Sequence, residues 1–311
     1  MLFRSMNSLS GAAQISSILF FIVVLLLSLE FIARRNQRFH ERHSRQISPE
    51  LEETTPTQKV TFLTICIVPL MLGFVIPVFV LLNFVFKGYA VFNLSEVFQI
   101  TSASLTISLL AAFFIMLVSF FLIVVSTYKS NNFQKTLIFL ASCGYAFPGT
   151  ILAVGIVVFI GWLNDLIYFR MSYFAGGFIV LVFAYCIRFL AVGNGAMRSG
   201  ISRINPNLID ASRTMGRSFF TTIKRIIIPL TYTNLLVGGI LVFVDILKEL
   251  PITLLLRPFN FETLATYVYQ YASDEMLEES SFAALIIVIA GLGPVIYLSA
   301  TIKKLSLKKS D

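Results

Sequence analysis

The sequence predicts an all-α integral membrane protein. The chain has 311 residues, of which 57% are hydrophobic and only 13% are charged, whereas a soluble domain carries about 25% charged residues. Its apolar runs reach the length of about 20 residues that a helix needs to cross about 30 Å of hydrocarbon. Backbone polar groups must pair within each segment in lipid, so these runs are predicted to be helices.

Seven apolar runs are long enough to span a bilayer. They cover roughly 11–33, 60–86, 100–127, 136–162, 172–193, 227–247 and 280–302. We expect five parts: a single transmembrane helix in 1–35, a cytoplasmic linker at 36–59, a six-helix domain at 60–302 with a polar loop at 205–226, and a tail at 303–311. The first run resembles a signal peptide in position, but it lacks a clear small-residue cleavage site and a basic segment follows it.

The distribution of basic residues predicts the orientation. Nineteen of the 24 Lys and Arg residues fall in alternate loops, which are therefore predicted to be cytoplasmic. This places the amino terminus outside, and the carboxyl terminus and the 205–226 loop inside. The net charge of +8 then reflects loop asymmetry and not a nucleic-acid partner. Arg188 is interpreted as lying near a cytoplasmic helix end and reaching to the interface.

The fourth run contains Pro148 followed by Gly149. Proline removes a backbone donor and glycine has no side chain, so we expect a kinked or broken helix here. A broken helix is able to line a translocation path, but proline and glycine are also common in packed membrane helices.

Charged residues cluster where the sixth run ends. Asp245 and Glu249 are four residues apart and would share one face if the helix continued, with Lys248 placed to pair with Asp245. Two interpretations stay open: an acidic, cation-attracting gate, or a helix end solvated at the interface. A short amphipathic helix is predicted within Phe261–Asp274, where it would meet a docked protein or lie on the membrane surface.

The loop 205–226 has clear helix signals. Asn205 followed by Pro206 predicts a helix start, and Gly216 predicts its end. Asp210 falls in the first turns, where a negative charge suits the helix dipole.

This loop resembles the coupling loop of binding-protein-dependent ABC importer permeases. The match rests on the sequence Asp210-Ala211-Ser212, then Gly216, Ile226, Ile228 and Pro229, with Asp, Ser and Ile where the family has Glu, Ala and Leu. The resemblance implies a six-helix type I, MetI-like transmembrane domain preceded here by one extra helix. It implies an ATPase-coupling set of Asp210, Ala211, Ser212, Gly216, Ile226 and Pro229, and a translocation path near Pro148, Gly149, Asp245 and Glu249.

The segment 248–266 resembles the outer loop of ferric-iron ABC permeases, and also that of thiamine and phosphonate relatives. The resemblance implies a permease for ferric iron in a bacterial inner membrane. The implied partners are a dimer of ABC ATPase subunits, a second permease half and a periplasmic iron-binding protein. The first helix resembles the last helix of an amino-terminal half, so we expect the carboxyl-terminal part of a split or truncated two-half permease.

No catalytic function, metal site or cofactor is predicted for this chain. It contains no Gly-x-x-x-x-Gly-Lys-Ser/Thr loop, so ATP hydrolysis is expected in a separate subunit. Its three cysteines lie in apolar runs, and both histidines lie in the linker. Three alternatives stay open: a permease for thiamine, phosphonate or polyamine, a secondary transporter driven by an ion gradient, or a remnant that does not transport.

Overall fold

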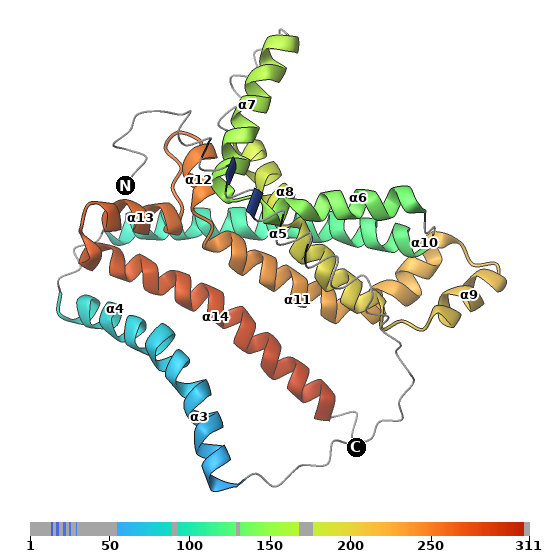
Figure 1. The fold of residues 1–311 in the computed structure, drawn as a ribbon, viewed down its shortest axis with the longest axis horizontal. Coiled ribbons are helices and arrows are strands. Elements are labelled where there is room, and N and C mark those ends of the chain that lie inside the picture. Colours follow the sequence, from blue (N-terminus) through green and yellow to red (C-terminus); the bar gives the residue numbers. More distant parts are fainter. Residues whose placement is uncertain are drawn as a thin grey trace.

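The computed structural model describes residues 55–88, 93–128, 131–167 and 177–307, together with a few scattered residues between 14 and 29. The predicted helix at 11–33, nearly all of the linker at 36–59 and the last residues of the tail lie outside the described residues. Within those residues every regular element is helical (Figure 1). The structure confirms the all-α prediction.

Five helical segments are long and apolar enough to cross a membrane. They are α3 (Pro56–Leu70) with η1 (Met71–Val75) and α4 (Ile76–Phe86); α5 (Leu94–Tyr128); α8 (Phe178–Ile201); α10 (Phe219–Thr222) with η4 (Ile223–Ile227) and α11 (Ile228–Leu247); and α14 (Leu277–Leu307). Each corresponds to a predicted apolar run.

Two of these segments contain a π-helical turn just before a proline. The turn η1 precedes Pro77, and η4 precedes Pro229. A proline ring clashes with the carbonyl four residues earlier in an α-helix. Those carbonyls belong to Gly73 and Arg225, which lie inside the widened turns, so the helices continue through the prolines without ending.

The fourth predicted run is broken, as its Pro-Gly pair predicted. Helix α6 (Asn132–Ser142) and the 3₁₀ turn η2 (Cys143–Ala146) meet α7 (Gly149–Ile167) at a bend of 113°. In Figure 1, α7 rises away from the layer that contains α6. The predicted span over 136–162 therefore consists of two helical halves, which count as a sixth span only if they are taken together.

The hydrophobic core lies where α5, α8 and α11 pack together. Its fully buried side chains include Ile115 of α5, Leu181 and Tyr185 of α8, and Val242 of α11. A smaller cluster joins α13 (Leu264–Ser273) to α5 and α14 through Leu264 and its neighbours. Many large apolar side chains on the outer faces are exposed, as expected for helices whose outer surface contacts lipid or other membrane subunits.

Three short helices connect the long ones: α9 (Pro206–Thr214), α12 (Pro251–Leu256) and α13. Helix α13 confirms the predicted short helix within 261–274, with Leu264 buried while Tyr269 is exposed. Figure 1 shows α9 and α13 at opposite ends of the molecule. The chain therefore presents one short helix at each end of its long core helices.

The structure corrects the placement of Arg188. Helix α8 is 24 residues long and continues past Asn194 and Arg198 to Ile201. Arg188 consequently lies near the middle of the helix and not near its end. The interpretation of a side chain reaching from a helix end to the interface is wrong.

Candidate functional site

The helix α9 is closed at both ends by its own sequence. The side chain of Asn205 accepts a hydrogen bond of 3.0 Å from the N–H of Asn207, and Pro206 occupies the first helical position. At the other end Gly216 has a φ of +71°. The N–H of Gly216 donates to the carbonyl of Arg213 at 2.9 Å, and that of Arg217 donates to Ser212 at 3.1 Å. This pair of bonds is a Schellman motif, which requires a left-handed residue and so favours glycine.

One face of α9 packs against the rest of the chain, and the other face is exposed. Ile209 and Ser212 are buried, and the Ser212 hydroxyl lies 2.7 Å from that of Thr222 on α10. Asp210 and Ala211 are exposed, and Asp210 forms a long ion pair of 3.8 Å with Arg213. The short helix is therefore attached through its buried face, while its outer surface presents polar residues together with the exposed apolar side chains of Leu208 and Met215.

The structure separates the predicted coupling residues into two groups. Asp210, Ala211, Ser212 and Gly216 lie on α9 or at its end, whereas Ile226 lies in η4 and Pro229 in α11. Ser212 is 2% exposed, so a direct contact of its side chain with another protein is not available in this conformation. The buried Ser212 side chain instead holds α9 against α10 through its contact with Thr222. A coupling role for these residues stays a prediction.

A second group of predicted residues meets at the break between η2 and α7. The Nε of Arg188 lies 3.5 Å from the Oε2 of Glu249, and both side chains are largely buried. A Cβ atom added to Gly149 would lie 2.8 Å from Nη1 of Arg188 and 2.8 Å from Oε1 of Glu249. The break, the central arginine and the carboxylate thus form one junction, which we call the α7–α12 junction.

Backbone groups complete this junction. Nη1 of Arg188 donates to the carbonyl of Phe147 at 3.1 Å, and the Glu249 carboxylate accepts from the N–H of Ile252 at 3.3 Å. The hydroxyl of Thr253 donates to the Glu249 carbonyl at 2.7 Å and lies 2.5 Å from that of Tyr185. Burial raises the pKa of the Glu249 carboxyl above its usual range, and the neighbouring Arg188 guanidinium opposes that rise.

Asp245 and Glu249 were expected to share one helix face if the helix continued, but the helix does not continue between them. Helix α11 ends at Leu247, and Pro251 starts α12, so the two carboxylates belong to different elements. Asp245 forms the expected ion pair with Lys248, at 3.0 Å, on the outside of the junction. The pairing of Arg188 with Glu249 was not predicted. A signal was present, because an isolated cation in an apolar run requires a partner.

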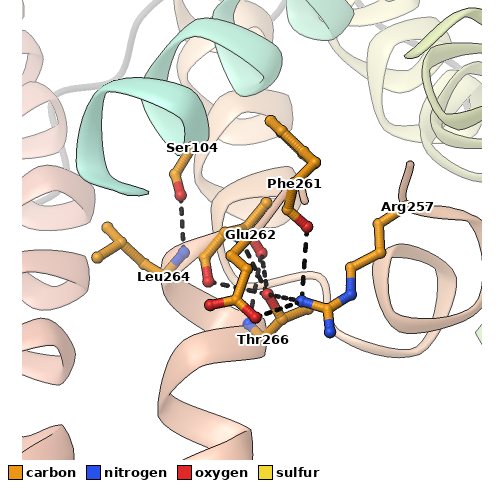
Figure 2. A network of polar contacts seen from close by, with 7 residues as sticks. Ser104, Arg257, Phe261, Glu262, Leu264 and Thr266 are labelled. Carbon is orange, nitrogen blue, oxygen red and sulfur yellow. Dashed lines mark hydrogen bonds and ion pairs between the residues drawn. The ribbon is translucent and has the colours of Figure 1, made fainter. Parts of the chain in front are cut away.

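A second polar network orders the segment between α12 and α13 (Figure 2). Nη1 of Arg257 donates to Oε1 of Glu262 at 3.0 Å and to the carbonyl of Phe261 at 3.5 Å. The N–H of Leu264 donates to the hydroxyl of Ser104 on α5 at 2.7 Å. In the part of the chain that the structure describes, no three His, Cys, Asp or Glu side chains gather where a metal ion would bind.

Comparison with known proteins agrees with this architecture. The chain is 24% identical over 295 residues to the Fe(3+)-transport system permease protein FbpB 2 of Haemophilus influenzae, covering 93% of this chain and 56% of that protein. The chain thus spans about half the length of this relative.

Among solved structures, a bacterial ABC transporter involved in the import of the acidic polysaccharide alginate has the same fold. It superposes with a TM-score of 0.64 at 15% identity, over 80% of this chain and 96% of that one. The architecture is that of a type I ABC importer transmembrane domain. The family model for the binding-protein-dependent transport system inner membrane component matches residues 121–304, more than half of the chain. This chain therefore belongs to the binding-protein-dependent transport system inner membrane component family.

Proposed function

We propose that this chain is a permease subunit of an ABC importer that passes ferric iron, delivered by a periplasmic binding protein, into the cytoplasm. A separate ATPase subunit docks on the exposed face of α9, and a second permease half completes the path. The observation that carries the proposal is α9 itself, a short helix with both ends closed, its inner face bonded to α10, at one end of the molecule (Figure 1).

The connection between α9 and the α7–α12 junction supports a mechanical role. The Ser212–Thr222 hydrogen bond joins α9 to α10, and the helix then continues through η4 and α11 to Leu247. Glu249 follows two residues later. A push on α9 is therefore transmitted along one continuous helical segment to the junction, as alternating access driven by ATP requires.

The substrate part of the proposal rests on two observations. The relative from Haemophilus influenzae is described as an Fe(3+)-transport permease. The segment 249–279 carries six carboxylates and one arginine, and hard cations such as Fe(III) favour oxygen ligands. A permease for thiamine, phosphonate or polyamine is the alternative within the same family.

Uptake of radioactive ferric iron tests this proposal. Cells that express the chain together with an ABC ATPase, a second permease half and a periplasmic iron-binding protein, and that lack their own ferric uptake system, are expected to accumulate iron while ATP is available. Uptake that persists without the ATPase, and stops when the proton gradient is collapsed, contradicts the proposal and favours a secondary transporter. Competition by thiamine but not by ferric iron contradicts the substrate.

The proposed location is a bacterial inner membrane with α9 on the cytoplasmic side. An Arg213→Cys variant tests this directly, because Arg213 is exposed on α9. In a cysteine-free background, an impermeant maleimide is expected to label it in inside-out vesicles and not in intact spheroplasts. Labelling only in spheroplasts contradicts both the orientation and the ATPase contact.

A further inference from the structure

We propose that the Arg188–Glu249 ion pair is a lock that fills the break between η2 and α7 in the resting permease, and that transport requires the pair to part. Arg188 and Glu249 then act as positioning residues that control when the junction opens. This inference rests on the proposed function, since it assigns a moving part to the same transport cycle.

A contribution to the stability of the fold does not explain well why this ion pair is present. The side chains of Arg188 and Glu249 are 19% and 8% exposed, and removing two charges from water costs several kcal/mol before their attraction is counted. Apolar residues of similar size often replace such a pair with no loss of stability. The two buried charges are better explained if their separation accompanies a change of conformation.

The polarity of the pair matches the two ends of the broken helix. The guanidinium of Arg188 donates to the carbonyl of Phe147, the residue that follows η2, at 3.1 Å. The carboxylate of Glu249 lies at the first residue of α7, Gly149, and accepts from the N–H of Ile252 in the first turn of α12. The carboxylate therefore lies near the amino-terminal ends of α7 and α12, which favour a negative charge, while Arg188, equally close to Gly149, bonds the carbonyl that precedes the break.

The pair is close but not optimally bonded. The Nε of Arg188 has no hydrogen-bond acceptor within the described residues, because its distance of 3.5 Å to Glu249 exceeds a good charge-assisted bond. Nη1 is held by the Phe147 carbonyl and not by Glu249. The two charges are thus each anchored to a different element, α8 with η2 on one side and α12 on the other. Relative movement of those elements separates the charges without leaving either without a partner.

Helix α11 supplies the force for that movement. Its last residue, Leu247, is buried and lies two positions before Glu249. Other charges near the pair are Asp245 and Lys248, which neutralise each other at 3.0 Å. A shift of α11 driven from α9 therefore displaces Glu249 away from Arg188, and the α7–α12 junction opens.

Cysteine labelling in the complete transporter tests the lock. Thr253 is fully buried beside the pair, so a Thr253→Cys reporter is placed in a background in which Cys66, Cys143 and Cys186 are replaced. The transporter is reconstituted in proteoliposomes, and reaction with an impermeant methanethiosulfonate is followed with and without ATP. A second reporter, Ile252→Cys, controls for loss of the threonine hydroxyl.

The lock predicts slow labelling at rest and labelling about tenfold faster during ATP turnover, as expected when a minor open state becomes populated. Glu249→Gln and Arg188→Met are each expected to give fast labelling without ATP. The double variant Asp245→Asn/Lys248→Gln, which removes the neighbouring ion pair without leaving an unpaired charge beside Glu249, is the matched control and is expected to leave the rate unchanged.

Labelling at the same rate in all variants and with ATP overturns the lock. This result is separable from failure of the proposed cargo, because the labelling reaction does not involve iron. Faster labelling with ATP in a transporter that takes up no iron supports the lock and contradicts only the substrate.

Discussion

The hydroxyl of Ser212 on α9 and the hydroxyl of Thr222 on α10 lie 2.7 Å apart, and both residues are almost fully buried. This is the polar contact that joins α9 to the helix that follows it across the Gly216 turn. Thr222 also donates to the carbonyl of Ser218 at 3.2 Å. The contact therefore fixes the angle between the proposed docking helix and α10, through which force is transmitted to α11.

Removing the Ser212 hydroxyl is expected to weaken coupling more than folding. Ser212→Ala loses about 1 kcal/mol, the net value of a typical hydrogen bond, while Thr222 keeps its bond to Ser218. We expect iron taken up per ATP hydrolysed to fall, with normal amounts of protein in the membrane. Ser102→Ala is the control, because that hydroxyl bonds the carbonyl of Gln99 within α5 and lies outside the proposed docking face. Equal transport ratios in both variants would contradict the role of the Ser212 contact.

Two substitutions of Gly216 distinguish the effect of backbone strain on uptake from the effect of an added charge. At a φ of +71°, an alanine costs about 1 kcal/mol, whereas asparagine tolerates this conformation. Gly216→Asn is expected to keep most uptake. Gly216→Asp has the same shape but adds a negative charge at the carboxyl end of α9, where the helix dipole is unfavourable, and is expected to abolish uptake with membrane insertion intact.

Gly195 provides the comparison for the alanine substitution. A Cβ at Gly195 meets no atom within 4 Å, and this residue lies within α8, so Gly195→Ala is expected to leave the thermal stability of the detergent-solubilised protein unchanged or slightly raised.

A Gly216→Asp variant with normal iron uptake at equal protein level would contradict the coupling role of α9.

Local signals in the sequence were enough to predict many elements of this fold. Three of these signals act on the backbone close to their own position. They are the side-chain cap of Asn205, the left-handed conformation of Gly216 and the break at Pro148, so each can be predicted without knowing which residues pack nearby. The apolar runs likewise mark the spans, because lipid requires each one to satisfy its own hydrogen bonds.

The ion pair at the α7–α12 junction was missed for a physical reason. Arg188 and Glu249 are distant in the chain, and the pair forms only because α8 packs against η2 and α12. Hydropathy also ended the fifth run before the polar residues Asn194 and Arg198, so α8 was predicted too short and Arg188 was placed near its end. Polar residues inside a helix, whether buried like Asn194 or exposed like Arg198, make the helix look shorter when its length is judged from hydropathy.

The Arg257 network is expected to hold the α12–α13 segment in one conformation. Arg257 reaches Glu262 and the carbonyl of Phe261 with one nitrogen (Figure 2). Arg257→Gln removes the ion pair and is expected to speed proteolytic cleavage between α12 and α13. Because both partners are about a third exposed, the loss of global stability is expected to be within about 1 kcal/mol. Lys248→Gln, which removes the more exposed pair with Asp245, should leave that cleavage rate unchanged.

Two glycines at the broken helix are expected to respond differently to alanine. A Cβ on Gly144 would overlap the backbone carbonyl of Ile187, which cannot move without displacing α8. Gly144→Ala is therefore expected to reduce the amount of folded protein strongly. A Cβ on Gly149 would instead meet the side-chain ends of Arg188 and Glu249 at 2.8 Å, which are able to rotate away, and the Cβ of Pro251 at 3.1 Å, which must shift by a few tenths of an ångström. Gly149→Ala is expected to insert and fold, but with the ion pair parted.

The measurable consequence of Gly149→Ala is a junction that is open in the absence of ATP. If the pair is a lock, this variant labels rapidly at Thr253→Cys in the absence of ATP and transports iron poorly, although its quantity in the membrane is normal. If the pair only stabilises the fold, Gly149→Ala lowers thermal stability while resting labelling stays slow and transport per folded molecule is unchanged. Comparing labelling, protein level and uptake in the two alanine variants therefore distinguishes a moving junction from a static one.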